Sequence, residues 1–168
     1  NGSIKQSVVI GSGLFGGPNL ADGDRFGFSL ASLGRLTPVD DSYQTALAIG
    51  AVGDDTGGNR RGAVHMVFVK SNGFLLTDNG SGGSPNQKIA HQQAGGPALV
   101  DIDQFGQSLA SIGYINGDAA LVVGADGDST QGTYRGAAYV LLLNPNGTVR
   151  TTNGITKIAS GVGGGPTL

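Results

Sequence analysis

Serine, histidine and aspartate, the residue types that carry out hydrolytic chemistry, occur in this chain without the spacing of a catalytic motif. Ser29 and Ser108 each follow a glycine by two positions, but alanines occupy positions 31 and 110, where a nucleophile elbow requires glycine. His91 has no suitable catalytic partner near it in the sequence. A Ser-His-Asp set would have to be assembled by the fold, and nothing in the spacing favours one. We therefore predict that the protein is not an enzyme.

Glycine-rich and polar stretches could bind a nucleotide, a metal or a glycan. Gly11–Gly16 matches G-x-G-x-x-G, but Pro18 follows it and no helical pattern appears, whereas a dinucleotide site needs a helix after the loop. The chain has no cysteine, which excludes disulfides and thiolate metal sites. N-glycosylation patterns begin at Asn1, Asn79 and Asn146, and chance matches are expected in a chain this rich in Asn, Gly, Ser and Thr. These stretches predict no cofactor.

The composition limits the classes of partner. The 168 residues carry a net charge of −2, which gives no reason to expect a nucleic acid or an anionic membrane surface. No run approaches the roughly 20 apolar residues that a membrane helix needs, so no membrane insertion is expected. Glycine accounts for 32 residues and recurs beside short apolar runs, which is typical of many short strands joined by tight turns.

Two copies of one sequence pattern occupy most of the chain. The offset between the copies is larger for the first matched segments than for the later ones, so the extra residues of the first copy fall in one loop. An insertion confined to a loop between matching strands is what a repeat fold tolerates. The matched pairs are Asp24–Gly34 with Asp103–Gly113, Ala46–Ala51 with Ala120–Ala125, and Arg61–Val69 with Arg135–Leu143.

Each copy predicts four strands that form one antiparallel sheet. The third strand alternates, with Val64, Met66 and Phe68 on one face, and the second is apolar on both faces, as in a sheet packed between neighbours. Asn-Gly at 72–73 and 146–147 predicts type I′ hairpin turns, because both residues accept positive φ. The predicted strands are 26–32, 46–52, 63–69 and 87–91 in the first copy, and 105–111, 120–125, 137–143 and 155–160 in the second.

Four-stranded sheets repeated along a chain are typical of propeller blades. The predicted fold class is therefore all-β, with four-stranded antiparallel β-propeller blades: two blades plus an extra outer strand. Residues 1–22 are interpreted as the outer strand and linker of a preceding blade, residues 23–99 as the first blade and residues 100–168 as the second.

Equivalent positions in the two copies explain several of the polar residues. His65 aligns with Tyr139, and a position that accepts either ring is better explained by packing than by catalysis. Ser29 and Ser108 also repeat in register, which favours a structural role. Asp24 and Asp103 stand just ahead of the two Phe-Gly dipeptides, where we predict that each carboxylate caps a turn.

The landmarks of the repeat resemble those of a known family. Phe26-Gly27 and Phe105-Gly106 each open a copy, and Ile49–Gly53 and Val123–Gly127 follow. These segments resemble the FG-GAP repeat of integrin α-subunit heads and large bacterial surface proteins, with valine or aspartate where the family has proline. The resemblance implies a β-propeller, of about seven blades in complete members. It also implies extracellular binding or adhesion, and often Ca²⁺ in the loop between the first and second strands.

The loops that would hold Ca²⁺ in this family are poor in carboxylates here, although such a site needs several oxygen ligands. Loops 34–46 and 113–120 retain four plausible ligands, Asp40, Asp41, Asn116 and Asp118. Asp126–Thr130 also has alternating oxygen ligands, and its counterpart Val52–Thr56 has a poorer set. We predict that these groups cap their own turns, so no metal ligand is assigned. Ca²⁺ stays open as an alternative through the resemblance.

Two blades cannot close a ring, and their open faces would leave apolar surface in water. Two interpretations follow. Either the chain is a piece of a longer array, or residues 3–10 of one copy add a strand to the sheet of the next copy. The second interpretation predicts self-association.

The resemblance implies a non-catalytic extracellular or cell-surface module for recognition or adhesion, with an unidentified protein or glycan ligand. A structural subunit that assembles into a fibre or ring by blade stacking or strand addition is the first alternative. A propeller-type lectin is the second, and its aromatic candidates are Tyr43, Tyr114 and Tyr134.

Overall fold

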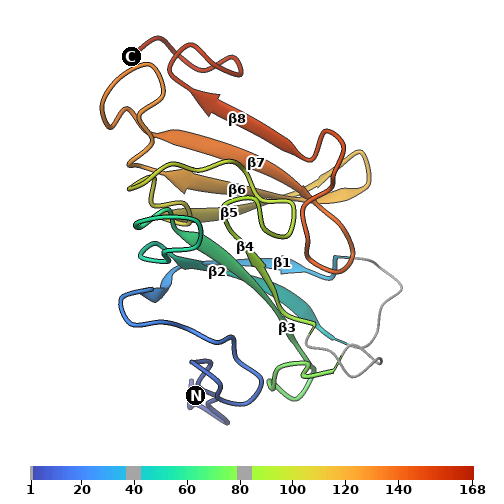
Figure 1. The fold of residues 1–168 in the computed structure, drawn as a ribbon. Coiled ribbons are helices and arrows are strands. Elements are labelled where there is room, and N and C mark those ends of the chain that lie inside the picture. The colour runs from blue at the N-terminus through green and yellow to red at the C-terminus, as the bar shows by residue number, and fades with distance from the viewer. Residues whose placement is uncertain (1, 37–42, 79–84) are drawn as a thin grey trace.

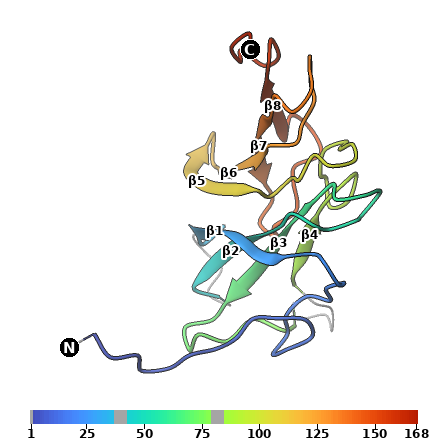
Figure 2. The same cartoon turned by 90° about the vertical axis from the view of Figure 1, so that its left-hand side faces the viewer.

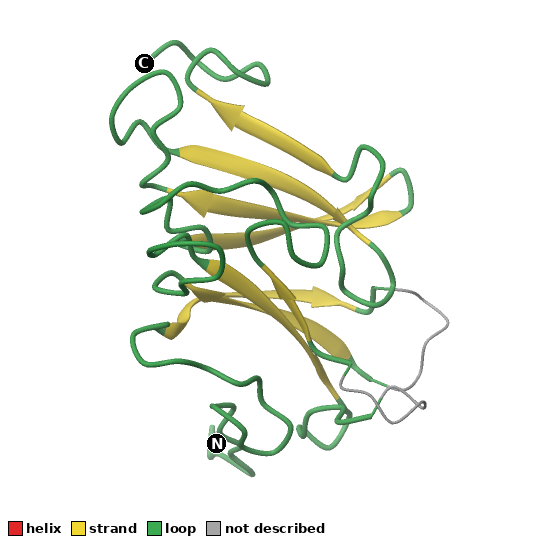
Figure 3. Ribbon diagram, in the orientation of Figure 1, coloured by secondary structure: helices red, strands yellow, loops and turns green. Residues whose placement is uncertain are grey.

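The chain folds into two stacked β-sheets, as Figures 1 and 3 show. The structure is a computed structural model that describes residues 2–36, 43–78 and 85–168. These residues contain strands and loops and no helix. Sheet 1 consists of β1 (Phe26–Gly34), β2 (Thr45–Ala51), β3 (Ala63–Val69) and β4 (Gln87–Ile89). Sheet 2 consists of β5 (Ser108–Ile115), β6 (Asp118–Ala125), β7 (Ala137–Leu143) and β8 (Ile155–Ala159).

Both sheets are antiparallel meanders in which each strand pairs with the next one along the chain. The register repeats as well as the order. Ala51 pairs with Ala63 at one end of the β2–β3 ladder, and their counterparts Ala125 and Ala137 pair at the same end of the β6–β7 ladder. The sequence repeat is therefore confirmed as a repeat of two four-stranded antiparallel sheets.

The first strand of the second copy begins later than the sequence predicts. β5 starts at Ser108, whereas the pattern predicts a start at Phe105. Gly106 and Gln107 both donate to the Gly124 carbonyl at 3.1 Å, which makes a bulge ahead of the regular ladder. The Phe105 amide instead donates to the Arg61 carbonyl, in the loop that leads into β3 of sheet 1.

The type I′ turn occurs at a different Asn-Gly from those predicted. Asn116 and Gly117 have φ of 52° and 91° and link β5 to β6 through a two-residue loop, as this turn type requires. At 72–73 and 146–147 only the glycine has positive φ, so that prediction is wrong. There the loops are longer, and the Gly73 amide closes a turn on the Lys70 carbonyl at 2.9 Å.

The main core lies between the two sheets. Alternate residues of β3 face sheet 2, and alternate residues of β7 face sheet 1, as the period of a strand requires. These side chains are at most 3% exposed: Val64, Met66 and Phe68 from β3, and Tyr139, Leu141 and Leu143 from β7. A smaller cluster of Ile49, Val67 and Leu75 covers the other face of sheet 1, with Ile10 and Phe26 packed against it.

The extra outer strand predicted over residues 3–10 does not form within this chain. Residues 2–22 contain only an isolated bridge, between Gly11 and Leu14. Ile4 and Val9 are 84% and 66% exposed, and the first residues extend away from both sheets (Figure 2). The reason is the pairing of sheet 1, because β4 already occupies the free edge of β3.

Candidate functional site

The opening segment of sheet 2 is held in a site on sheet 1 that we call the Phe-Gly seat of sheet 1, formed by Ser29, Gly50, Arg61 and Gly62. The Phe105 side chain is fully buried, and its amide donates to the Arg61 carbonyl at 2.9 Å. The Ser29 hydroxyl donates to the Gly106 carbonyl at 2.6 Å. Figure 2 shows the resulting arrangement, in which β1 lies beside β5.

Two glycines of the seat are required by close approach of the neighbouring backbone. A Cβ at Gly50 would lie 2.2 Å from the Gly106 carbonyl oxygen. A Cβ at Gly62, where φ is +80°, would lie 2.2 Å from the Phe105 carbonyl oxygen. The glycines of the Ile-Gly-Ala and Arg-Gly-Ala segments therefore let one sheet approach the backbone of the next.

Polar contacts surround the seat. Arg61 Nε donates to Asp101 Oδ1 at 2.8 Å, and the Asp101 side chain is about half exposed, so we expect only a modest contribution from this pair. His91 Nδ1 accepts a hydrogen bond from the Leu99 amide at 2.9 Å, on the segment that leads to Phe105. The structure thus gives His91 a role in holding the linker between the sheets.

Phe26 and Phe105 lie in matching positions on their own sheets. Phe26 meets His65 edge-on with ring centroids 5.4 Å apart, and Phe105 meets Tyr139 at 5.5 Å, each pair at an interplanar angle of 78°. Phe26 is nevertheless only partly buried, because no other sheet in the described part of the chain covers it as sheet 1 covers Phe105.

The second predicted set of oxygen ligands forms ion pairs. Asp54 Oδ2 lies 2.6 Å from Lys88 Nζ, and Asp128 Oδ2 lies 2.6 Å from Lys157 Nζ. The other oxygen of Asp54 accepts the Thr56 amide at 2.8 Å, so each aspartate also caps its own turn, as predicted. Burial opposes ionisation of Asp54, but the hydrogen bonds from Lys88 and Thr56 outweigh it and hold its pKa below the ordinary value.

The first predicted set does not form a metal-binding loop in the described part of the chain. Asn116 belongs to the two-residue turn, and Asp118 pairs with Arg150. Asp40 and Asp41 lie outside the described residues. Over residues 2–36, 43–78 and 85–168, no group of three acidic, histidine or cysteine side chains is placed to hold a metal ion.

Asp24 and Asp103 cap turns, as the sequence predicts. Asp24 Oδ2 accepts the Ala21 amide and Asp103 Oδ2 accepts the Val100 amide, each at 2.8 Å. The second oxygen of Asp103 is buried without a hydrogen-bond partner among the described residues, and burial raises the pKa of this carboxyl.

The G-x-G-x-x-G motif at Gly11–Gly16 forms a loop that occurs again after each sheet. The Leu14 amide donates to the Gly11 carbonyl at 3.1 Å, as Gln93 donates to Ala90 and Val162 to Ala159 at 3.1 and 3.0 Å. Within the described residues, no helix follows any of these loops. The motif is part of the repeat, and a dinucleotide site is not formed.

The aromatic candidates for sugar binding separate into buried and exposed residues. Tyr43 is buried against Phe68 with ring centroids 4.8 Å apart, and its hydroxyl accepts the Leu36 amide at 2.8 Å. It is therefore closed to a ligand, and its assignment as a candidate is corrected. Tyr114 and Tyr134 are 52% and 60% exposed. Of the predicted glycosylation positions, Asn146 is exposed, and positions 1 and 79 lie outside the described residues.

Sequence reasoning missed the Asp–Lys pairs and the hydrogen bond from Ser29 to Gly106. A signal for the pairs was present, because Asp54 and Lys88 both recur, as Asp128 and Lys157. The aspartate and the lysine are farther apart along the chain in the first copy than in the second, which concealed the match. Nothing in the sequence indicates the partner of Ser29.

Replacing His65 with tyrosine is expected to stabilise the protein below about pH 6.5. Nε2 of His65 is buried without a hydrogen-bond partner among the described residues, and burial, aided by the charge of Lys88, lowers its pKa from 6.5 to about 4. The unfolded chain therefore binds a proton that the folded chain does not. The free energy of unfolding falls as pH drops through this window, by up to about 1.4 kcal/mol per pH unit. His65→Tyr removes this loss.

Urea unfolding at about pH 5 and about pH 7 measures the effect. Tyr139→His is the matched control in sheet 2: it removes the hydrogen bond of the Tyr139 hydroxyl to Asp128, 3.0 Å long, and should introduce the same pH dependence. If wild type and His65→Tyr lose the same stability between the two pH values, the buried neutral imidazole is not the cause.

No protein-family model matches this chain, and no curated protein matches it. In the described part of the chain, no helical segment has the length and hydropathy of a membrane span.

Proposed function

We propose that the chain is a pair of FG-GAP-type propeller blades and acts as a non-catalytic extracellular recognition or adhesion module. The observation that carries this proposal is the Phe-Gly seat of sheet 1. There Phe105 and Gly106 lie between two sheets of matching order and register, against Gly50 and Gly62. Phe105, Gly106 and Gly50 belong to the segments that resemble the family, and each has a packing role.

We place the recognition surface at the end of the sheets where the linker between them contacts the β2–β3 loop and the β6–β7 loop. The Ile102 amide donates to the Asn59 carbonyl at 2.9 Å, and the Gly127 amide donates to the Asp103 carbonyl at 3.2 Å, so the linkers are fixed to these loops. Tyr134 is the large aromatic side chain of the β6–β7 loop and is 60% exposed. Exposed aromatic residues on loops held by a rigid scaffold are favoured positions for binding.

A binding panel tests this function. The immobilised protein is probed with extracellular-matrix proteins, cell-surface proteins and a glycan array. We expect a protein ligand whose affinity falls about tenfold or more in Tyr134→Ala. Tyr114→Ala is the matched control, because Tyr114 is similarly exposed but lies at the opposite end of sheet 2, beside the β5–β6 turn. Glycan binding without protein binding would favour a lectin. Absence of both would contradict a recognition role.

A structural subunit is the second candidate, favoured by the open face of sheet 2. Val64 and Met66 in sheet 1 are fully buried under sheet 2, but their equivalents Ala138 and Val140 are only partly buried. An apolar sheet face of this kind binds another sheet readily. Filaments or rings in electron micrographs of the purified protein would support this alternative.

A further inference from the structure

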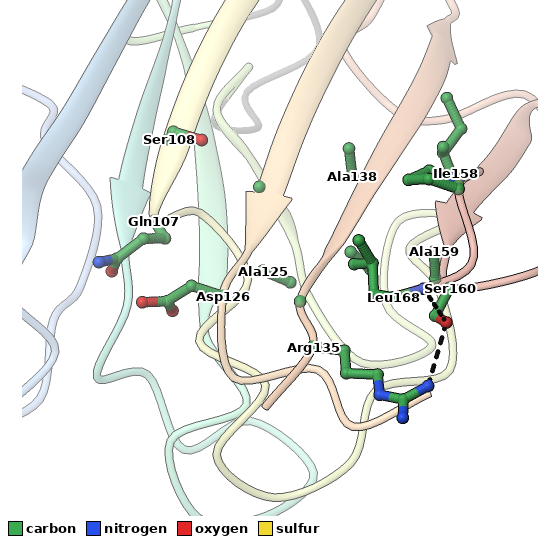
Figure 4. A pocket seen from close by; sticks show the side chains of 14 residues that line it. Gln107, Ser108, Ala125, Asp126, Arg135, Ala138, Ile158, Ala159, Ser160 and Leu168 are labelled. Carbon is green, nitrogen blue, oxygen red and sulfur yellow. Dashed lines mark hydrogen bonds between the residues drawn. The ribbon is translucent and has the colours of Figure 1, made fainter. Parts of the chain in front are cut away.

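The outer face of sheet 2 carries a copy of the Phe-Gly seat. A cavity of about 390 Å³ opens there, and Figure 4 shows side chains from β5, β7 and β8 around it. Its lining residues are the equivalents of those that hold Phe105 and Gly106 on sheet 1. The residues equivalent to Ser29, Gly50, Arg61 and Gly62 are Ser108, Gly124, Arg135 and Gly136. We call these four residues the Phe-Gly seat of sheet 2.

The seat of sheet 2 is preformed. Leu168 N donates to Ser160 Oγ at 3.2 Å (Figure 4). On sheet 1, Leu99 N donates to His91 Nδ1 in the same way. Arg135 Nη1 also donates to Ser160, at 3.2 Å. The Ser108 side chain is exposed, and its hydroxyl has no hydrogen-bond partner among the described residues, whereas that of Ser29 binds the Gly106 carbonyl.

We propose that the Phe-Gly seat of sheet 2 docks the opening segment of a further blade, a polypeptide of the form Asp-x-Asp-x-Phe-Gly. The inference rests on the proposed function. The form comes from the occupant of the equivalent seat, in which Asp101 pairs with Arg61, Asp103 caps the turn, and Phe105-Gly106 enters between the sheets. Residues 22–27 of the first copy have the same form.

The segment that docks in the seat belongs to a further blade. That blade has no equivalent of residues 11–20 ahead of its Phe-Gly dipeptide. A second copy of this chain would dock through Phe26-Gly27, and this would bring its residues 11–20 to the place that residues 159–168 already hold. Both segments form the same loop. β8 pairs with β7 from Ile155 to Ala159, and the Leu168 amide donates to Ser160 Oγ at 3.2 Å, so residues 159–168 are held at both of their ends.

The seat is tested by extending the chain after Leu168 with a copy of residues 100–107, which follow Leu99 in the first copy. The covalent attachment gives a high effective concentration, so weak docking is still measurable. We expect the Tm to rise by about 3 °C or more. The matched control carries alanine at the position of the extension that corresponds to Phe105, and its Tm should equal that of the unextended protein.

Gly124→Ala separates docking from folding. In the unextended protein the new Cβ would lie 2.3 Å from the Ser108 hydroxyl, which can rotate away. At the equivalent Gly50, a Cβ would collide with the Gly106 carbonyl. An alanine at position 124 would therefore leave no room for the matching carbonyl of a docked segment. We expect Gly124→Ala to lower the Tm of the unextended protein only slightly, and the extension to give no rise above the Tm of that unextended variant. A rise that survives Gly124→Ala, or one given equally by the alanine control, overturns the proposal.

Sedimentation of the unextended protein over a range of concentrations tests the other occupant. A monomer at all concentrations supports a further blade. Association that Gly124→Ala abolishes would assign the seat to a second copy and overturn our choice. Since these readouts are stability and mass, the ligand panel can fail while the seat stands, and the seat can fail while ligand binding stands.

Discussion

Phe105→Ala is expected to lower the free energy of unfolding by about 3–5 kcal/mol, the range for truncating a buried aromatic side chain. The ring is 0% exposed and lies against Tyr139 on its own sheet. Its backbone amide is bound to the Arg61 carbonyl, in the loop that leads into β3 of the other sheet, which limits how far the surroundings can close around the cavity. The loss therefore combines lost burial with an unfilled space between the sheets.

Phe26→Ala is the internal control for this prediction. Phe26 has the same ring contact within its sheet, with His65, but no second sheet of the described residues covers it. We expect a loss of about 1–2 kcal/mol, in proportion to the smaller area removed from water. Urea unfolding of the two variants beside wild type gives both values. Equal losses would mean that sheet 1 does not cover Phe105.

Gly50→Ala is expected to lower the free energy of unfolding by about 3 kcal/mol, which is at the upper end of the range for overpacking a core. The substitution adds only one methyl group. The cost is high because the two sheets must separate locally to make room for it. The new Cβ would lie 2.2 Å from the Gly106 carbonyl oxygen and 2.4 Å from Ser29 Oγ. The carbonyl is backbone and is itself hydrogen-bonded to Ser29, so it cannot turn aside as a side chain could.

Gly124→Ala is the matched change in sheet 2, where the opposing atom is the mobile Ser108 hydroxyl. We expect a loss below about 1 kcal/mol. Thermal unfolding and hydrogen exchange of the β3 amides should show the difference, with faster exchange at Val64 and Met66 only in Gly50→Ala. The prediction fails if the two variants unfold alike, because the close approach of the sheets at Gly50 would then be absent.

The repeat and its strands could be predicted because they follow from periodicity. Val64, Met66 and Phe68 alternate along β3 and are buried on one face, as the pattern indicates. The later matched segments share one offset, and this places β6 and β7 in the register of β2 and β3. These features depend on local spacing, which a sequence displays directly.

Turn types could not be predicted from the Asn-Gly dipeptide alone. Of the asparagines at 72, 116 and 146, each followed by glycine between two paired strands, only Asn116 has positive φ. At 116–117 the strands close on Ile115 and Asp118, so the loop has two residues. At 72–73 the bridge between Val69 and Leu75 leaves a longer loop. The strand register decides the turn, and register is a property of the whole sheet.

The contacts of the seat could not be predicted for a related reason. Gly50 and Gly62 are visible as repeated letters, but the atoms that approach them belong to residues 105 and 106 of the other sheet. Likewise, the polar loop around Tyr43 predicts an exposed aromatic residue, whereas packing against Phe68 buries it. Such contacts depend on tertiary packing between segments that are distant in the sequence.

Detecting the contact between Gly62 and Phe105 in solution would test whether sheet 2 stacks on sheet 1. These residues form a parallel bridge that joins the two sheets, and the Phe105 amide donates to the Arg61 carbonyl at 2.9 Å. In a two-dimensional NOE spectrum of the isotope-labelled protein, we predict a cross-peak between the Phe105 amide proton and the α-protons of Gly62. A well-dispersed spectrum without that cross-peak, and without any other between the two sheets, would contradict the account.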